Sequence, residues 1–422
     1  MSACRGTAVF ITLREIQPEK ITFIINSAFL IVIAMRLSSR LPNDLTMSPF
    51  FAELENRKKS ISDYIDMTVS SPIKVGLPID LESAIENSKQ EFGVWVPDAA
   101  GKANSREAVA NYYRSRGGNF SPEDIVLTAS TSEAYSVLFK TFCDPGDCIL
   151  TPLPGYPLLD TLAELEHLEC YPYFLKQVGK RFVIDTDTLL SAPDNAKILL
   201  LVSPHNPTGH CVNELEWNEA IAFCEERDMV LVVDEVFGDY AFDERVKRSW
   251  LFERASSAKC PIVWLNGLSK TVGSPQLKLG WMAIHSPEGE FDKLHEALEF
   301  VEDAYLSVSS PAQALGIPLL QGSAEYAKQV QDRLEMNLQS LRKYFPESRE
   351  CPKVYGGWYA TIHLGDDDEE LTLRLIAEAR VLVQPGFFFD FEEDGWVVIS
   401  LLQKPELFAE GIARIKCFVE KM

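Results

Sequence analysis

The sequence predicts an α/β fold, with a large domain built on a mostly parallel sheet flanked by helices and a smaller α+β domain at the C-terminus. Helix-length amphipathic segments separate a series of short apolar runs, at Cys148–Leu150, Ile198–Val202, Met229–Val233 and Pro261–Leu265. These runs do not alternate with polar residues, which is typical of strands buried on both faces of a parallel sheet. We therefore expect helices on both faces of that sheet.

Composition supports an ordinary globular protein. Of the 422 residues, 46% are hydrophobic and 24% are charged, which excludes a disordered chain and a polytopic membrane protein. The net charge of −22 repels phosphate backbones, so we expect no nucleic acid partner. Nine Cys without a CxxC pair predict reduced thiols and a cytoplasmic location, and six His without an HExxH motif favour no metal site.

The first 35 residues differ from the rest of the chain. Residues 21–35 are almost entirely apolar, but this stretch is shorter than the roughly 20 residues that a membrane span requires. We interpret residues 1–35 as an atypical N-terminal extension and expect no membrane partner; a short membrane-tethering segment is the alternative.

The domain organisation follows from where the strand and helix rhythm changes, after Ser309-Ser310-Pro311. We expect a large ligand-binding domain at residues 76–310 and a small C-terminal domain at 311–422. Residues 36–75 are predicted to pack against the small domain.

The first strand of the large domain is predicted at Ile125–Leu127. A polar turn at Thr128–Ser132 follows it, and a helical pattern then continues through Ala134, Leu138 and Phe142. Asp144-Pro145-Gly146 ends that helix, because proline and glycine do not continue one.

Each later apolar run ends in a polar cluster, at Ser203–Gly209, Asp234–Tyr240 and Asn266–Gly280. Ligands of open α/β sheets bind at the carboxyl ends of the strands, so these clusters are the candidate site. The chain has no GxSxG, GxGxxG or GxxxxGK[ST] motif, which argues against serine hydrolases, Rossmann dehydrogenases and P-loop NTPases.

The strand ends offer one chemically useful group each: Asn206, Asp234 and Lys270. A pyridoxal phosphate enzyme needs a lysine for a Schiff base, a carboxylate against the pyridine nitrogen and a polar group at the ring hydroxyl. It also needs a phosphate cup at a helix N-terminus, where residues 130–132 (Ser-Thr-Ser) open a helix directly after a strand.

In these motifs the chain resembles the class I/II, fold-type I aminotransferases. The matching segments are NPTG at 206–209, DEVF at 234–237 and Ser269-Lys270, and the steps from Asn206 to Asp234, Lys270 and Lys278 follow the order of that family. Supporting matches lie at residues 106–113, 144–147 and 154–157. The resemblance covers roughly residues 60–405.

The resemblance implies a role for each site residue. Lys270 would hold pyridoxal 5'-phosphate as an internal aldimine and act as general base, Asp234 would pair with the ring nitrogen, and Asn206 with the ring hydroxyl. The remaining cofactor-binding residues would be Ser130, Thr131, Ser132, Tyr156, Ser269 and Lys278, with Tyr156 stacked on the ring. The resemblance further implies a small-molecule amino donor and keto acid as substrates, and a homodimer with active sites at its interface.

Structural roles are the alternatives for several of these residues. Asp234 is also suited to cap a helix, Asn206 to form an Asx turn before Pro207, and residues 130–132 to cap a helix N-terminus. Packing in the core is the alternative for Tyr156. We interpret His205 as a hydrogen-bonded loop residue.

The chain departs from the family pattern at five positions. Lys278 stands in place of an arginine that grips the phosphate, Phe237 in place of a tyrosine, Gly267 in place of a serine and Trp95 in place of a tyrosine that crosses the dimer. Val398 occupies the place of the arginine that binds the substrate α-carboxylate. Because an apolar side chain cannot offset the desolvation of a carboxylate, either another cation, such as Lys404 or Arg380, replaces it or the substrate is not a standard α-amino acid bound in the standard way.

The function that these observations favour is pyridoxal phosphate-dependent transamination. The missing arginine keeps two alternatives open: a carbon–sulfur β-lyase that uses the same cofactor, and a catalytically silent homologue that binds it.

Overall fold

The computed structural model describes residues 38–42, 46–242, 249–306, 308–365 and 367–422. The chain separates into two compact units, Met1–Leu41 and Pro42–Met422. In the first unit, the N–H of Leu41 donates to the carbonyl oxygen of Ser38 and closes a turn; the apolar stretch at 21–35 lies outside the described residues. All the described helices and strands belong to the second unit.

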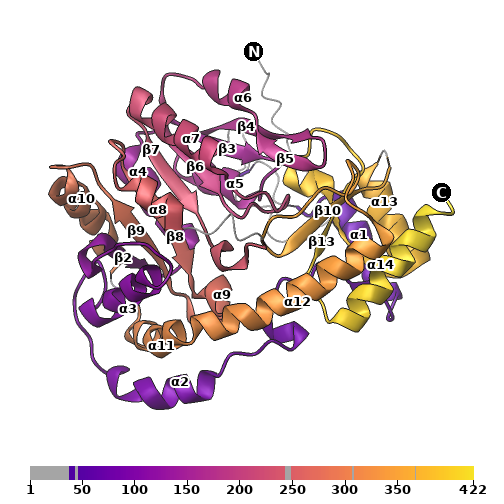
Figure 1. Ribbon diagram of the computed structural model, residues 1–422, viewed down its shortest axis with the longest axis horizontal. Helices are drawn as coiled ribbons and strands as arrows, with labels where there is room; N and C mark the ends of the chain where they lie inside the picture. The colour runs from indigo at the N-terminus through magenta and orange to yellow at the C-terminus, as the bar shows by residue number, and fades with distance from the viewer. Residues whose placement is uncertain (1–37, 43–45, 243–248, 307, 366) are drawn as a thin grey trace, which may run out of the picture. The chain divides into compact units, whose positions relative to one another are not determined.

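A mostly parallel sheet forms the centre of the second unit (Figure 1). Within the described residues it has eight strands, in the spatial order β2 (Ile125–Thr128), β9 (Gly280–His285), β8 (Ile262–Gly267), β7 (Val230–Asp234), β6 (Ala196–Val202), β3 (Cys148–Leu153), β4 (Glu169–Val178) and β5 (Arg181–Ile184). β9 and β5 run antiparallel to their neighbours, and the other pairings are parallel. The predicted fold class is therefore confirmed.

The antiparallel strand β9 is the main feature of this sheet that the apolar runs did not predict. A parallel neighbour of β8 would require a crossover connection, usually a full helix. Residues 268–279 instead fold into the short helix α9 (Leu268–Thr271) and the 3-10 turn η7 (Pro275–Leu277), after which the chain returns beside β8. This tight return keeps residues 268–280 close to the carboxyl end of β8.

Helices cover both faces of the sheet, as the unalternating runs predict. Along β7, Val230 and Val232 belong to one apolar cluster and Leu231 and Val233 to another, so each face packs against its own layer. The first layer contains α4 (Thr131–Phe142), α5 (Leu158–Leu165) and α10 (Phe291–Asp303). The second contains α3 (Ala103–Arg114), α6 (Thr186–Leu190), α7 (Glu214–Arg227) and α8 (Ser249–Ala255).

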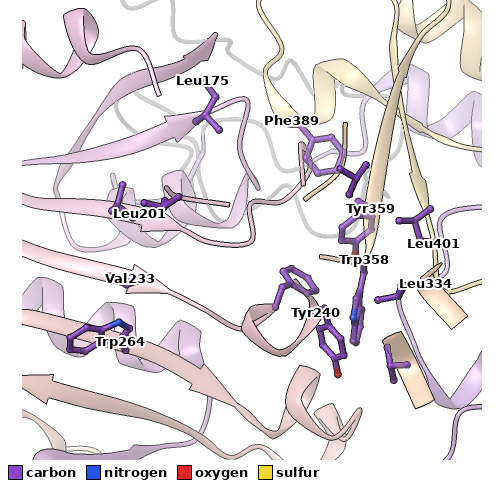
Figure 2. Packing of buried hydrophobic residues seen from close by; sticks show 14 of the residues in the cluster. Leu175, Leu201, Val233, Tyr240, Trp264, Leu334, Trp358, Tyr359, Phe389 and Leu401 are labelled. Atoms are coloured by element: carbon purple, nitrogen blue, oxygen red, sulfur yellow. The ribbon is translucent and has the colours of Figure 1, made fainter. Parts of the chain in front are cut away.

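A smaller antiparallel sheet lies in the C-terminal part, in the order β10 (Tyr359–His363), β13 (Trp396–Ser400) and β12 (Gln384–Pro385). The C-terminal helices are α11 (Ser310–Gln321), α12 (Ser323–Tyr344), α13 (Asp368–Arg374), the π-helix η8 (Leu375–Ala379) and α14 (Pro405–Val419). Trp358 and Tyr359 pack where the two sheets approach each other, near Tyr240 from the large sheet's side (Figure 2). No described helix combines the length and apolar character needed to cross a membrane.

The N-terminal part of the second unit contacts this C-terminal region. β1 (Ile65–Asp66) pairs in parallel with β11 (Val381–Leu382). From α1 (Pro49–Ser60), Arg57 Nη1 donates to the carbonyl oxygen of Leu373 at 2.8 Å. α2 (Leu81–Ser88) instead packs on α11. The domain boundaries at 75/76 and 310/311 stay a prediction.

We expect replacement of Asn337 by leucine to destabilise the protein. Asn337 is fully buried in α12, and its Nδ2 donates to the carbonyl oxygens of Leu401 at 2.7 Å and Gln403 at 2.6 Å. Leucine would leave both carbonyls buried without a donor, so the free energy of unfolding should fall by about 2–3 kcal/mol in urea denaturation. Gln339→Leu, on the exposed side of the same helix, is the control and should change it by less than about 0.5 kcal/mol. Equal values for the two variants would contradict this role.

Candidate active site

A cavity of about 450 Å³ lies at the carboxyl ends of β6, β7 and β8. The sequence-predicted site residues all line it: Ser130, Thr131, Ser132, Tyr156, Asn206, Asp234, Ser269, Lys270 and Lys278. The structure thus brings together residues from segments more than 140 positions apart, although their roles in binding stay predictions.

Lys270 stands on α9, directly after β8. Its Nζ lies 4.9 Å from the ring centroid of Trp358 and 5.6 Å from that of Phe237. Burial lowers the pKa of this amine to about 8, although the charge of Asp234 acts in the opposite direction. Half of such an amine is neutral near pH 8, and a neutral amine is the form that attacks carbonyl carbons.

Asp234 ends β7, beside the strand that leads to Lys270. Its Oδ2 accepts a hydrogen bond from the Tyr135 hydroxyl at 2.7 Å, and its Oδ1 accepts from the N–H of Val236 at 3.1 Å. Burial raises the pKa of the Asp234 carboxyl, while these two hydrogen bonds and the charge of Lys270 act to lower it. A cation inside the cavity would favour the ionised form. Tyr135 was not predicted.

The N-terminus of α4 forms another part of the cavity wall. Ser130 caps this helix, since its Oγ accepts from the N–H of Glu133 at 3.2 Å. Capping uses the oxygen of Ser130 as an acceptor, so the hydroxyl proton remains available to a ligand. With the hydroxyls of Thr131 and Ser132 and the positive end of the helix, this corner is suited to bind an anion.

Glycine at position 280 lets β9 lie against the same helix end. A Cβ there would lie 2.9 Å from the carbonyl carbon of Ser130 and 3.0 Å from the backbone nitrogen of Thr131. Gly267 is similarly crowded, since a Cβ would lie 2.9 Å from the carbonyl oxygen of Leu279. That crowding explains why no serine stands at position 267. Lys278, the residue after η7, also lines the cavity.

Asn206 and His205 present unpaired polar atoms at the end of β6. Both residues line the cavity, and Asn206 Oδ1 and His205 Nε2 are buried without a hydrogen-bond partner among the described residues. The other ring nitrogen of His205 contacts Thr208 Oγ1 at 2.9 Å, and burial lowers the pKa of His205 to about 3, so the ring is neutral. Only one of the two ring nitrogens of His205 is therefore hydrogen-bonded, so our interpretation of a hydrogen-bonded loop residue holds in part. Because both atoms lie at the cavity, they are available to hydrogen-bond a ligand there.

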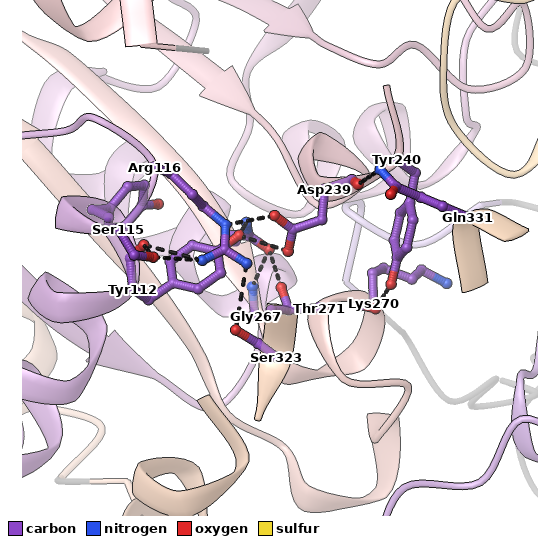
Figure 3. Close-up of polar contacts among 12 residues, drawn as sticks. Tyr112, Ser115, Arg116, Asp239, Tyr240, Gly267, Lys270, Thr271, Ser323 and Gln331 are labelled. Atoms are coloured by element: carbon purple, nitrogen blue, oxygen red, sulfur yellow. Dashed lines mark hydrogen bonds and ion pairs between the residues drawn. The ribbon is translucent and has the colours of Figure 1, made fainter. Parts of the chain in front are cut away.

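A buried polar network, which the sequence did not reveal, holds the turn that carries Lys270 (Figure 3). Asn266 Oδ1 accepts from the N–H of Gly267 at 2.7 Å and from Thr271 Oγ1 at 3.0 Å, on either side of Lys270. Its Nδ2 donates to the Tyr112 hydroxyl, which donates to Asp239. These bonds fix both ends of the turn.

Two further contacts support this network. Arg116 Nε donates to Asp239 Oδ1 at 2.6 Å, and the Arg116 guanidinium lies 3.7 Å from the ring centroid of Tyr112. The Tyr240 hydroxyl donates to the carbonyl oxygen of Lys270 itself at 2.6 Å (Figure 3). The lysine is thus attached to a rigid support, as precise positioning requires.

The wall formed by the N-terminal segment and the small sheet contains residues that sequence analysis missed: Ser70, Tyr359, Gln384 and Phe388. Tyr156, which is 49% exposed, lies on the large-domain side. Lys404 and Arg380, the two cations expected to replace the missing arginine, do not line the cavity, and Val398 is fully buried. The structure therefore brings neither of these two cations to the cavity, and the group that would meet the substrate carboxylate stays a prediction.

The chain resembles known proteins over most of its length. Residues 80–415 match the family described as aminotransferase class I and II. Tyrosine aminotransferase from Bos taurus is 27% identical over 416 residues, which cover 90% of this chain and 89% of that protein. Tyrosine aminotransferase from Caenorhabditis elegans is 26% identical over 330 residues, which cover 76% of this chain and 70% of that protein.

A solved structure shares the fold. Alanine aminotransferase from Pyrococcus furiosus superimposes with a TM-score of 0.78 at 24% identity, over 88% of this chain and 96% of that chain. At this identity the likeness concerns the fold alone.

We expect Lys270 to be the most reactive lysine near pH 8. With a trace amount of an amine-reactive reagent, modification of Lys270 should rise with pH and reach half of its plateau near pH 8, because only the neutral amine reacts. Ordinary lysines follow a pKa near 10.4. Peptide mass spectrometry across a pH series would measure this, and a half-point near 10 for Lys270 would contradict the effect of burial.

Proposed function

This chain belongs to the class I and II aminotransferases, which are pyridoxal phosphate-dependent enzymes, and on that premise we propose a role for each cavity residue and a class of amino donor. The observation that carries the proposal is the meeting of Lys270, Asp234 and the N-terminus of α4 in one cavity. The substrates are a small amino compound and a keto acid. Nothing in the comparisons favours a lyase or a silent homologue.

The residues present fit the cofactor. The N-terminus of α4 and Lys278 would hold the phosphate, and the close approach of Gly280 leaves that corner open to it. The unpaired Oδ1 of Asn206 would meet the ring hydroxyl. Asp234 would pair with the ring nitrogen, and Ser269 and Tyr156 would complete the contacts. When bound, the cofactor supplies a sink for the electrons released at the donor's α-carbon.

Lys270 is the residue that would carry the cofactor and move protons. Its pKa of about 8 allows Nζ to accept a proton from the donor's α-carbon near neutral pH and to release it again. Asn266 and Tyr240 keep the backbone around Lys270 in place, so that Nζ returns to the same position in each cycle. Tyr135 and the N–H of Val236 keep the Asp234 carboxylate oriented.

We further propose that the amino donor has an aromatic or large apolar side chain. Leu158, Leu159, Tyr156 and Phe388 give the cavity an apolar side wall that could not pair with a charged side chain. The two curated relatives named above are tyrosine aminotransferases, which supports the same class.

We propose a cytoplasmic homodimer whose interface includes the segment around Trp95. Trp95 is 75% exposed, and Val94 and Val96 beside it are also exposed. Three adjacent apolar side chains on a surface are typical of a contact area. The proposed large domain (76–310) would carry this segment, and residues 36–75 would belong with the small domain (311–422), in line with the pairing of β1 and β11.

Addition of pyridoxal phosphate should give a visible absorption band that phenylalanine or tyrosine bleaches, with release of the corresponding keto acid. Lys270→Ala should abolish the band and reduce turnover by roughly 10²–10⁴-fold or more, because the general base is lost. Lys259→Ala, an exposed lysine before the amino end of β8, is the control and should leave both unchanged. A band that no amino donor bleaches would argue for one of the two alternative functions.

Light scattering after size exclusion should give twice 47.4 kDa. Trp95→Glu should shift the protein toward the monomer at micromolar concentration, because a carboxylate would be desolvated at the interface. Leu215→Glu, at a 66% exposed apolar position on α7, is the control and should remain dimeric. A monomeric wild-type protein would overturn the dimer while leaving the proposed chemistry intact.

A further inference from the structure

The small sheet presents an uncharged surface to the cavity where a cation was expected. On β13, Val398 pairs with Thr361 of β10 on one side and with Gln384 of β12 on the other, and Ser400 pairs with Tyr359. Directly opposed residues share a face, and so do residues two apart along a strand. Val398, Gln384 and Tyr359 therefore belong to the same face, and the last two line the cavity.

The cations that line the cavity, among the residues described, are Lys270 and Lys278. Both have roles toward the cofactor in the proposed function. The small-sheet side offers the hydroxyls of Ser70 and Tyr359 and the carboxamide of Gln384. Burial raises the pKa of the Tyr359 hydroxyl to about 12, so this group is also neutral in the working pH range.

Gln384 has an unmet hydrogen-bonding requirement. Its Oε1 is buried and has no partner among the described residues. A buried acceptor without a donor costs about 1–3 kcal/mol, so a ligand that donates a hydrogen bond there is favoured. A carboxylate has no hydrogen to donate to Oε1, whereas a carboxamide has two.

We propose that Gln384, with Ser70, forms a neutral subsite for the group attached to the donor's α-carbon, so that the enzyme accepts α-amino carboxamides with a kcat/KM within about tenfold of that for α-amino acids. The inference rests on the proposed function and names its substrate class more closely. A guanidinium at position 398 would select for the carboxylate through a charge-assisted pair. Neutral hydrogen-bonding groups offset less of the free energy that a carboxylate loses when it leaves water, and they are sufficient for an uncharged amide.

The test compares phenylalanine with phenylalaninamide, which share the apolar side chain and differ only at this group. The ratio of their kcat/KM values, acid over amide, should be below about ten at pH 8.5. A ratio above ten would overturn the neutral subsite. If the proposed function itself failed, neither donor nor any other would bleach the absorption band.

Gln384→Glu provides the charge test at nearly constant shape. It should raise the KM and the spectroscopically titrated dissociation constant for phenylalanine by at least about tenfold more than those for phenylalaninamide, because two carboxylates would meet. Gln339→Glu adds the same charge on the exposed side of α12 and should not change the acid-to-amide ratio. An unchanged ratio in Gln384→Glu would remove Gln384 from the subsite.

Gln384→Leu covers the case in which the glutamate variant does not fold. It removes both hydrogen-bonding atoms without adding charge, so affinity for phenylalaninamide should fall about tenfold, while the absorption band persists. Full affinity for the carboxamide in this variant would also overturn the proposal.

Discussion

The constraint on which this molecule depends is the placement of an amine and a carboxylate at the ends of two neighbouring strands inside an apolar sheet. In the parallel pairing of β7 and β8, Asp234 stands opposite Leu265, five positions before Lys270. Neither group tolerates burial alone, and each is supported by a different part of the chain: Asp234 by Tyr135, and the Lys270 turn by Asn266. A change in strand register would separate the pair from both supports.

Much of the large domain could be predicted from the sequence because its strands are buried on both faces. Unalternating apolar runs mark such strands, and the polar residues that end them, such as Asn206 and Asp234, must meet at one edge of the sheet. The roles of Tyr135 and Gln384 could not be predicted in this way. Tyr135 is one of several aromatic residues in an amphipathic helix, and its bond to Asp234 spans 99 positions. Gln384 lies in a two-residue strand, which is too short to show a pattern.

The positions at which the chain departs from the family pattern differ in their structural cause and in their consequence for the site. Gly267 follows from crowding, since the backbone of β9 occupies the space of a side chain. Phe237 packs edge-on to Trp358, at 5.3 Å between ring centroids, so its role here is in the aromatic wall near Lys270. Val398 differs from both, because it replaces a charge in the sheet face that carries Gln384 and Tyr359. It is the departure that bears on substrate choice.

The pairing of β1 with β11 also constrains how the protein is made. Ile65 meets Val381 in the finished sheet, and the hydrogen bond from Arg57 to Leu373 spans 316 positions. During synthesis at roughly 5–20 residues per second, the N-terminal segment waits about a quarter of a minute to a minute for these partners. Its apolar residues Phe50 and Leu54, buried in the folded protein, are exposed for that time. In the cell, this interval is when the nascent chain is most open to chaperones and proteases.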